Sequence, residues 1–267
     1  MTSPSTFETA LMTMQDMMKD PLANIVLMHA DDKLMLGHMQ SDWTGLAPIL
    51  EEDIAASSMS QDDLSHALVL FDALAQRFGL SADDIAFERD AADYRCCDLV
   101  TVPDDFNWAI ALMKRWFVAT FTALGIDRLA TIDDEDLAQR CRRLIPEQAI
   151  HVRHLSEWVI RLGSGTDESN RRMQEALDAL APAASMLFEP PDQSIESTEN
   201  FCCGREEMFE QWKSQCERTL REANLSATLT LSPRSMAGGR RGAHADHFAS
   251  QLAEMTDVRR AEPAPAW

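Results

Sequence analysis

The sequence has few glycines and none of the glycine-rich signatures that bind phosphates. Its 267 residues include 10 Gly, and no Gly-x-Gly-x-x-Gly or P-loop spacing occurs among them. Binding sites for NAD, FAD or ATP therefore have no support. No serine lies in a Gly-x-Ser-x-Gly context, so the sequence also lacks the nucleophile motif of the common hydrolases.

Basic residues are scarce as well. The chain has 24 Lys and Arg against 44 Asp and Glu, which gives a formal net charge of −20. A chain with this charge repels polyanions such as DNA, RNA and anionic membranes. We therefore expect neither a nucleic acid nor a membrane among its partners.

Long apolar runs and spaced cysteine pairs are also missing. No run approaches the roughly 20 apolar residues that span a bilayer. The first residues hold Glu8 and Asp16 without the basic start of a signal peptide, which predicts a cytoplasmic protein. No Cys-x-x-Cys occurs, so we expect reduced structural thiols rather than a zinc or redox site. The cysteines are Cys96, Cys97, Cys141, Cys202, Cys203 and Cys216.

The sequence is instead rich in helix formers and helical periodicity, and no stretch alternates long enough for a strand. We predict one all-α domain: a lead-in helix within residues 1–20, a core bundle over 22–188, and C-terminal helices with a Gly-rich loop over 189–267. Residues 225–231 are expected to be extended. Four long central helices predict a ferritin-like bundle. The expected helices cover residues 7–18, 22–40, 48–78, 106–124, 134–162, 167–188, 204–224 and 245–258.

Spacings of three and four residues place a small polar set inside this bundle. On the fourth core helix Gln148 and His151 lie one turn apart on the apolar stripe, and on the second Asp63 and His66 do the same. Lys33 lies near the middle of the inward face of the first core helix. A carboxylate and a histidine three residues apart on facing helices is the arrangement found in di-iron bundles.

This polar set does not suit two metal ions. Only Asp63 is a carboxylate, whereas Lys33 would repel a metal and Ala119 has no ligand atom. Two iron ions in a low-dielectric core require several carboxylates. We therefore expect no metal in this chain and a vacated core in which Lys33 neutralises Asp63. The six core positions are Lys33, Asp63, His66, Ala119, Gln148 and His151.

Two other interpretations stay open. A single transition metal bound by Asp63, His66 and His151, with Gln148 or Glu147 nearby, is compatible with imidazole ligation. In the other interpretation the two histidines are ordinary core residues and form no site.

Several short segments occur in order along most of the chain. They are Trp43-x-Gly45-x-Ala47-Pro48 with Glu51 and Asp53, Arg89-Asp90, His151-x-Arg153-x-x-Ser156-x-Trp158-x-x-Arg161-Leu162-Gly163-x-Gly165-Thr166, Arg172-Met173-Gln174, Gly238-Gly239-x-x-Gly242-x-His244, Leu252-x-Glu254-Met255 and Trp267. This ordered set, over about residues 25–267, resembles the family of C-type subunits of the bacterial phenylacetyl-CoA epoxidases (ring 1,2-epoxidases). The resemblance depends on the whole series, because no single motif in it is specific.

The resemblance implies an all-helical, ferritin-like fold and a place in a multicomponent di-iron oxygenase that epoxidises the ring of phenylacetyl-CoA. In that family a related A-type subunit holds the di-iron centre and binds the CoA thioester. The C-type subunit is its non-catalytic structural partner, and a small B-type subunit and an iron–sulfur flavin reductase complete the system. The resemblance thus implies no catalytic residue and no cofactor in this chain.

The core departs from that family's pattern at three places. Residues 60–66 read Ser-Gln-Asp-Asp-Leu-Ser-His, closer to the Asp-Glu-x-x-His of the catalytic subunit than to the usual apolar segment. Ala119 replaces an Asp, and Gln148 stands where the catalytic subunit has a metal-binding Glu. The alternative to a structural subunit is thus a metal-binding ferritin-like protein or a divergent oxygenase component.

The most basic segment is the Gly-rich loop ahead of the last predicted helix. Gly238 and Gly239 permit positive φ angles, which would let backbone amides form an anion nest. Together with Arg240, Arg241 and His244 they are candidates for contact with a CoA phosphate or an acidic partner face. The alternative is a structural loop that leads into the last helix.

Overall fold

The computed structural model describes residues 6–191, 205–231 and 238–262, and every regular element within them is helical. The predicted all-α class is therefore confirmed. The α-helices are α1 (Thr6–Lys19), α2 (Pro21–Gln40), α3 (Leu50–Phe78), α4 (Ala82–Phe87), α5 (Asp98–Thr101), α6 (Trp108–Leu129), α7 (Glu135–Gly163), α8 (Asp167–Leu180), α9 (Arg205–Glu222) and α10 (Asp246–Ala261). The 3₁₀ helices are η1 (Ser41–Trp43), η2 (Ala91–Asp93), η3 (Ala181–Phe188) and η6 (Gly239–Arg241).

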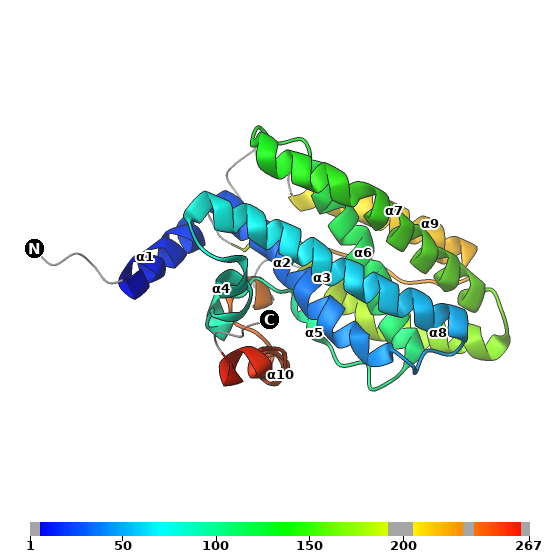
Figure 1. Cartoon of the computed structure of the whole chain (residues 1–267). Helices are drawn as coiled ribbons and strands as arrows, with labels where there is room; N and C mark the ends of the chain where they lie inside the picture. The colour runs from blue at the N-terminus through cyan, green and yellow to red at the C-terminus, as the bar shows by residue number, and fades with distance from the viewer. Residues whose placement is uncertain (1–5, 192–204, 232–237, 263–267) are drawn as a thin grey trace, which may run out of the picture.

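Two long helix pairs form the bundle. The helix α2 packs along α3 and α6 packs along α7, while α3 and α7 also contact each other (Figure 1). A crossover that contains α4, η2 and α5 connects the first pair to the second. This is the ferritin-like arrangement that four central helices and one long connection predict.

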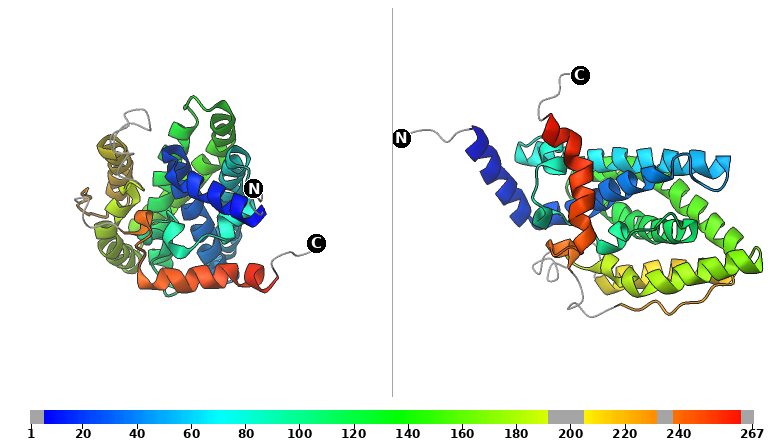
Figure 2. Two further views of the ribbon diagram at one scale, coloured as in Figure 1. Left: turned by 90° about the vertical axis from the view of Figure 1, so that its left-hand side faces the viewer. Right: turned by 90° about the horizontal axis from the view of Figure 1, so that it is seen from below.

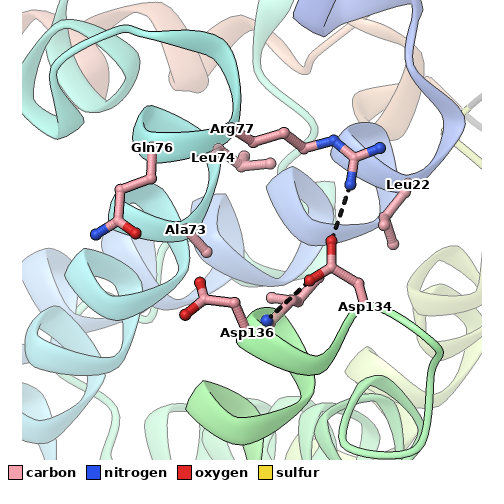
Figure 3. Close-up of a pocket in the computed structure, with 8 residues that line it drawn as sticks. Leu22, Ala73, Leu74, Gln76, Arg77, Asp134 and Asp136 are labelled. Atoms are coloured by element: carbon pink, nitrogen blue, oxygen red, sulfur yellow. Dashed lines mark hydrogen bonds and ion pairs between the residues drawn. The ribbon is translucent and has the colours of Figure 1, made fainter.

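The starts of α2 and α7 and the end of α3 meet around a cavity of about 260 Å³ (Figure 3). Asp20 caps α2 by accepting from the Ala23 amide at 2.9 Å, and Asp134 caps α7 by accepting from the Leu137 amide at 3.1 Å. The Arg77 guanidinium, in the last turn of α3, donates to both cap carboxylates. One cation at the negative end of α3 therefore ties together two positive helix ends.

The helix α6 is the most apolar of the four long core helices. Among the described residues it alone is long and apolar enough to cross a membrane by length and composition, with a mean hydropathy of 1.4. The expectation that no such run exists was therefore wrong. However, 83% of its most apolar 18-residue segment is buried inside the bundle. Buried core helices of soluble proteins have the same length and composition, so α6 is weak evidence for a membrane span.

The helix α6 also runs past its predicted end near residue 124 to Leu129. Gly125 lies inside it because the His29 side chain of α2 packs there: a Cβ at this position would be 2.1 Å from His29 Cε1. The glycine therefore serves the close approach of two helices and does not end the helix.

The predicted long helix at 167–188 is two elements. Thr166 accepts from the Ser169 amide at 3.1 Å and caps α8 as its residue type suggests. The α-helix then ends at Leu180, and the 3₁₀ helix η3, which has Pro182 near its start, continues to Phe188. A proline lacks the amide hydrogen that the α-helical pattern needs, which explains the change.

The remaining elements lie around this core. The helix α1 extends away from one end of the bundle, and α10 crosses near α5 and η2 (Figure 2). Residues 225–231 contain no regular element, and Gln174 of α8 exchanges two hydrogen bonds with the backbone of Ser226. Part of the Gly-rich loop, Cys202, Cys203 and Trp267 lie outside the described residues. The described cysteines form no disulfide and are buried: Cys96, Cys97, Cys141 and Cys216.

Candidate functional site

A buried ion cluster occupies the middle of the four-helix core. Lys33 of α2 donates from Nζ to Asp63 Oδ1 of α3 at 3.0 Å and to Gln148 Oε1 of α7 at 2.7 Å. Arg115 of α6 donates from Nη2 to Asp63 Oδ2 at 2.7 Å. All four side chains are nearly inaccessible to solvent. The ion pair between Lys33 and Asp63 that the sequence suggested is thus present, and each core helix contributes one member of the cluster.

Arg115 is the member that the sequence reasoning missed. It lies four residues before Ala119, which places both on one face of α6. Ala119 itself offers no ligand atom, and the spacing of four residues is the sequence signal that relates it to this cation. With Arg115 the cluster holds two cations and one carboxylate, so its net charge is positive.

Asp63 stays ionised in this setting. Burial by itself would raise the pKa of its carboxyl, but the charges of Lys33 and Arg115 outweigh burial and hold the pKa below its usual value. Each oxygen of this carboxylate accepts from a separate cation, so a metal ion bound to Asp63 would lie close to both positive charges.

The two core histidines each pair with a carboxylate at the bundle surface. His66 Nε2 lies 2.6 Å from Glu147 Oε2, and His151 Nε2 lies 2.9 Å from Asp62 Oδ2. Burial lowers the pKa of both rings below the ordinary histidine value, so each is neutral at pH 7. Because a carboxylate only accepts, Nε2 carries the proton and donates in both pairs. The two histidine–carboxylate pairs connect α3 to α7, through residues that precede and follow Asp63 in α3.

The residues do not fit the di-iron centre that the resemblance associates with the A-type subunit, nor a single metal at Asp63, His66 and His151. A cation placed there would meet the Lys33 ammonium and the Arg115 guanidinium. His66 Nδ1 is buried without a hydrogen-bond partner, but one imidazole nitrogen is not a site. Within the described ranges, no three His, Cys, Asp or Glu side chains are grouped so that they could hold a metal ion.

Two further buried ion pairs start from the same helix. Asp31, Asp32 and Lys33 are consecutive on α2, and all three are buried. Arg89 holds Asp31, with Nη1 donating to Oδ2 at 3.0 Å. Arg240 holds Asp32, with Nη1 and Nη2 donating to Oδ1 and Oδ2 at 2.7 Å each. Charges that would otherwise prevent α2 from being a core helix are thus each paired with a different part of the chain.

The predicted role of Arg240 in the Gly-rich loop is wrong. Arg240 is fully buried on Asp32 and on backbone carbonyls of the core, so its guanidinium does not face outward to a CoA phosphate or a partner. The positive φ that we expected at Gly238 and Gly239 occurs at Gly242, where φ is 80°. Gly239 packs against Cys96, whose carbonyl oxygen would lie 2.6 Å from a Cβ at Gly239.

The neighbours of Arg240 also contact the protein itself, although the Arg241 side chain is partly exposed. The Arg241 Nε donates to the carbonyl of Pro190 at 3.3 Å, and the His244 ring stacks on Phe248 with 3.7 Å between centroids. Arg240 therefore has the structural role that the sequence left open as the alternative, and it joins this loop to α2. Contact of the partly exposed Arg241 with a partner or a CoA phosphate stays a prediction.

The fully buried His29 of α2 should make the stability of the fold depend on pH. Burial, with the charges of Arg240 and Lys33, lowers the pKa of His29 to about 3. The unfolded chain binds this proton near pH 6.5 and the native chain does not, so stability should decrease as the pH falls below 6.5. We expect His29→Phe to remove about 2 kcal/mol of the stability difference between pH 7 and pH 5. Urea unfolding at both pH values measures this, and equal pH differences in the two proteins would contradict it.

Comparison with known proteins decides the family. The family model described as "Phenylacetic acid catabolic protein" matches residues 6–267. The chain belongs to this family. The curated relatives include the C-type subunit of the 1,2-phenylacetyl-CoA epoxidase of Escherichia coli (strain K12), which is 29% identical over 239 residues, or 89% of this chain and 95% of the relative. The A-type subunit of the same enzyme is 22% identical over 181 residues, or 68% of this chain and 58% of that relative.

Proposed function

We propose that this chain is a C-type, non-catalytic structural subunit of a multicomponent di-iron oxygenase that epoxidises the ring of phenylacetyl-CoA. It binds and supports an A-type subunit that carries the iron and the CoA thioester. A small B-type subunit and a reductase complete the assembly in the cytoplasm. The observation that carries the proposal is the ion cluster: Lys33 and Arg115 hold Asp63 where metal ligands would otherwise face one another.

The comparisons support this assignment from a second direction. The match to the C-type relative covers nearly the full length of both chains, whereas the match to the A-type relative is weaker and covers little more than half of that protein. A chain that keeps the helical bundle of the catalytic subunit but lacks its metal ligands is expected to support that subunit and not to carry out the reaction. The cluster also replaces the electrostatic function of a metal, because it neutralises a buried carboxylate and joins four helices.

The test is co-expression with the A-type subunit that the same cell encodes. We expect a stable complex on size-exclusion chromatography, with iron in stoichiometric amount only when the A-type subunit is present. Elemental mass spectrometry of this chain purified alone, without chelators from iron-supplemented cells, should find far less than one metal ion per chain. Failure of the two chains to associate would refute the structural role. About one metal per chain, lost in Asp63→Ala, would favour the metal-binding alternative.

A further inference from the structure

The outward face of α3 carries an uncharged stripe with a pair of exposed apolar side chains toward each end. Leu50 and Ile54 form one pair and Leu64 and Leu68 the other, and Leu50 is 69%, Ile54 61% and Leu68 50% exposed. Gln61 is exposed on the same face. From its first leucine to its last the stripe is about 27 Å long. Exposed apolar side chains gathered on one face without charged residues are typical of the core of a protein interface.

The stripe continues into a groove at the end of the bundle. Leu46, which is half exposed, lies just before α3 and lines a groove of about 540 Å³ together with Phe106. The other walls of the groove include Trp43 and Trp108, whose rings meet edge to face at 5.0 Å, and Met173. The groove gives the α3 stripe an aromatic pocket at one end.

The backbone that presents Phe106 is strained. Asp105 and Phe106 have φ angles of 49° and 55°, in the left-handed region that is unfavourable for non-glycine residues. The result of this conformation is that Phe106 stands 63% exposed beside the groove, although its aromatic ring would gain stability from burial. Strain that exposes an aromatic side chain is consistent with a partner that covers it.

The charged residues around this surface are mostly acidic. Residues 34–76, which include nearly all of α3, contain no Lys or Arg, while Glu51 and Asp105 are exposed beside the stripe and groove. Arg172 of α8 lines the groove, but its guanidinium is paired with Glu168 at 2.7 Å. Two copies of this chain, each with a net charge of −20, would bring like charges together if they docked through this face. The charge pattern therefore disfavours a second copy and favours a partner with a basic margin.

We propose that the α3 stripe and the groove beside Phe106 form the docking surface for the A-type subunit, through an apolar helix with basic residues along its edges. This inference rests on the proposed function. The A-type subunit is the assigned occupant because the A-type relative is itself similar in sequence to this chain over 181 residues, which leads us to expect a bundle of the same kind in it. A two-fold dimer of identical chains pairs the same patch of both subunits, and two related chains with similar bundles can pair by the same geometry.

The decisive variants place a cation in the stripe. Ile54→Arg and Leu68→Arg change side chains that are already exposed, so both proteins should fold, which circular dichroism checks. Each should weaken binding of the A-type subunit by roughly 30-fold or more in isothermal titration calorimetry, because an arginine would lie unpaired in a dry interface. The matched control is Val258→Arg, which makes the same kind of change at a 70% exposed apolar residue of α10 and should bind as the wild type does.

A second measurement does not depend on loss of binding. A photo-reactive amino acid at position 61 should cross-link to the A-type subunit in the complex, whereas the same group at position 258 should not. Wild-type affinity in Ile54→Arg and Leu68→Arg, with the wild-type chains still forming a complex, would overturn this surface and leave the proposed function intact. Failure of the wild-type chains to associate would refute both. Cross-linking of position 61 to a second copy of this chain would overturn the assigned occupant.

Discussion

Asp63→Asn should lower the free energy of unfolding by roughly 3–5 kcal/mol. The native carboxylate accepts from Lys33 Nζ at 3.0 Å and from Arg115 Nη2 at 2.7 Å, and all three groups are buried. A neutral amide would leave two buried cations without a counter-charge and would direct its own NH₂ group at one of them. Urea unfolding at pH 7, followed by circular dichroism, measures the loss.

The control for this prediction uses the excess of positive charge in the cluster, which has two cations and one carboxylate. Lys33→Met removes one of the two cations and leaves a neutral pair of Asp63 and Arg115, so it should cost less than Asp63→Asn. In the Asp63→Asn background the same Lys33→Met change should restore part of the lost stability. If Asp63→Asn were as stable as the wild type, the carboxylate would not be the charge partner of these cations.

The pH dependence of this difference has a definite sign. The native pKa of Asp63 lies below its value in the unfolded chain because Lys33 and Arg115 stabilise the ionised form against the effect of burial. The stability that Asp63 contributes is therefore present above the unfolded pKa and decreases as the pH falls through the native one. The gap between the wild type and Asp63→Asn should narrow in acid.

The sequence predicted the bundle well because its strongest signals are local. The positions of α3 and α7 follow from apolar residues every three or four positions, and the starts of α7 and α8 follow from Asp134 and Thr166. The same periodicity placed Lys33 and Asp63 on facing stripes, and the rule that buried charges are paired then predicted their contact.

The parts that the sequence did not predict depend on contacts between distant residues. Asp32 and Arg240 are 208 positions apart, and no periodicity relates them. Asp31 and Asp32 also lie on α2, which is buried on every side. Amphipathic periodicity therefore could not predict which part of the protein these two carboxylates contact. The glycines of residues 238–242 suggested an anion site because local sequence does not distinguish a loop that binds a ligand from one that fills a gap in its own protein.

Arg240→Met should destabilise the fold by a similar amount, roughly 3–5 kcal/mol. The arginine makes two parallel hydrogen bonds to Asp32, each 2.7 Å long, and donates to the carbonyls of Met28 at 3.0 Å and Arg95 at 2.8 Å. Methionine keeps most of the side-chain volume but leaves the Asp32 carboxylate buried and without its cation. Chemical unfolding measures the cost, and limited proteolysis should show earlier cleavage near α10, which this loop connects to the core.

Two neighbouring variants separate a structural role from a binding role. Arg241→Met alters the adjacent, partly exposed guanidinium and should cost less than about 1 kcal/mol. Arg240→Lys keeps the charge but loses the planar pair of donors, so its stability should fall between those of the wild type and Arg240→Met. A ligand-binding Arg240 would behave differently, since its loss would weaken CoA or partner binding and leave unfolding unchanged. Equal stability of Arg240→Met and Arg241→Met would contradict the internal role, whereas a large gap between them would show that the buried pair of Arg240 and Asp32 stabilises the connection between α10 and α2.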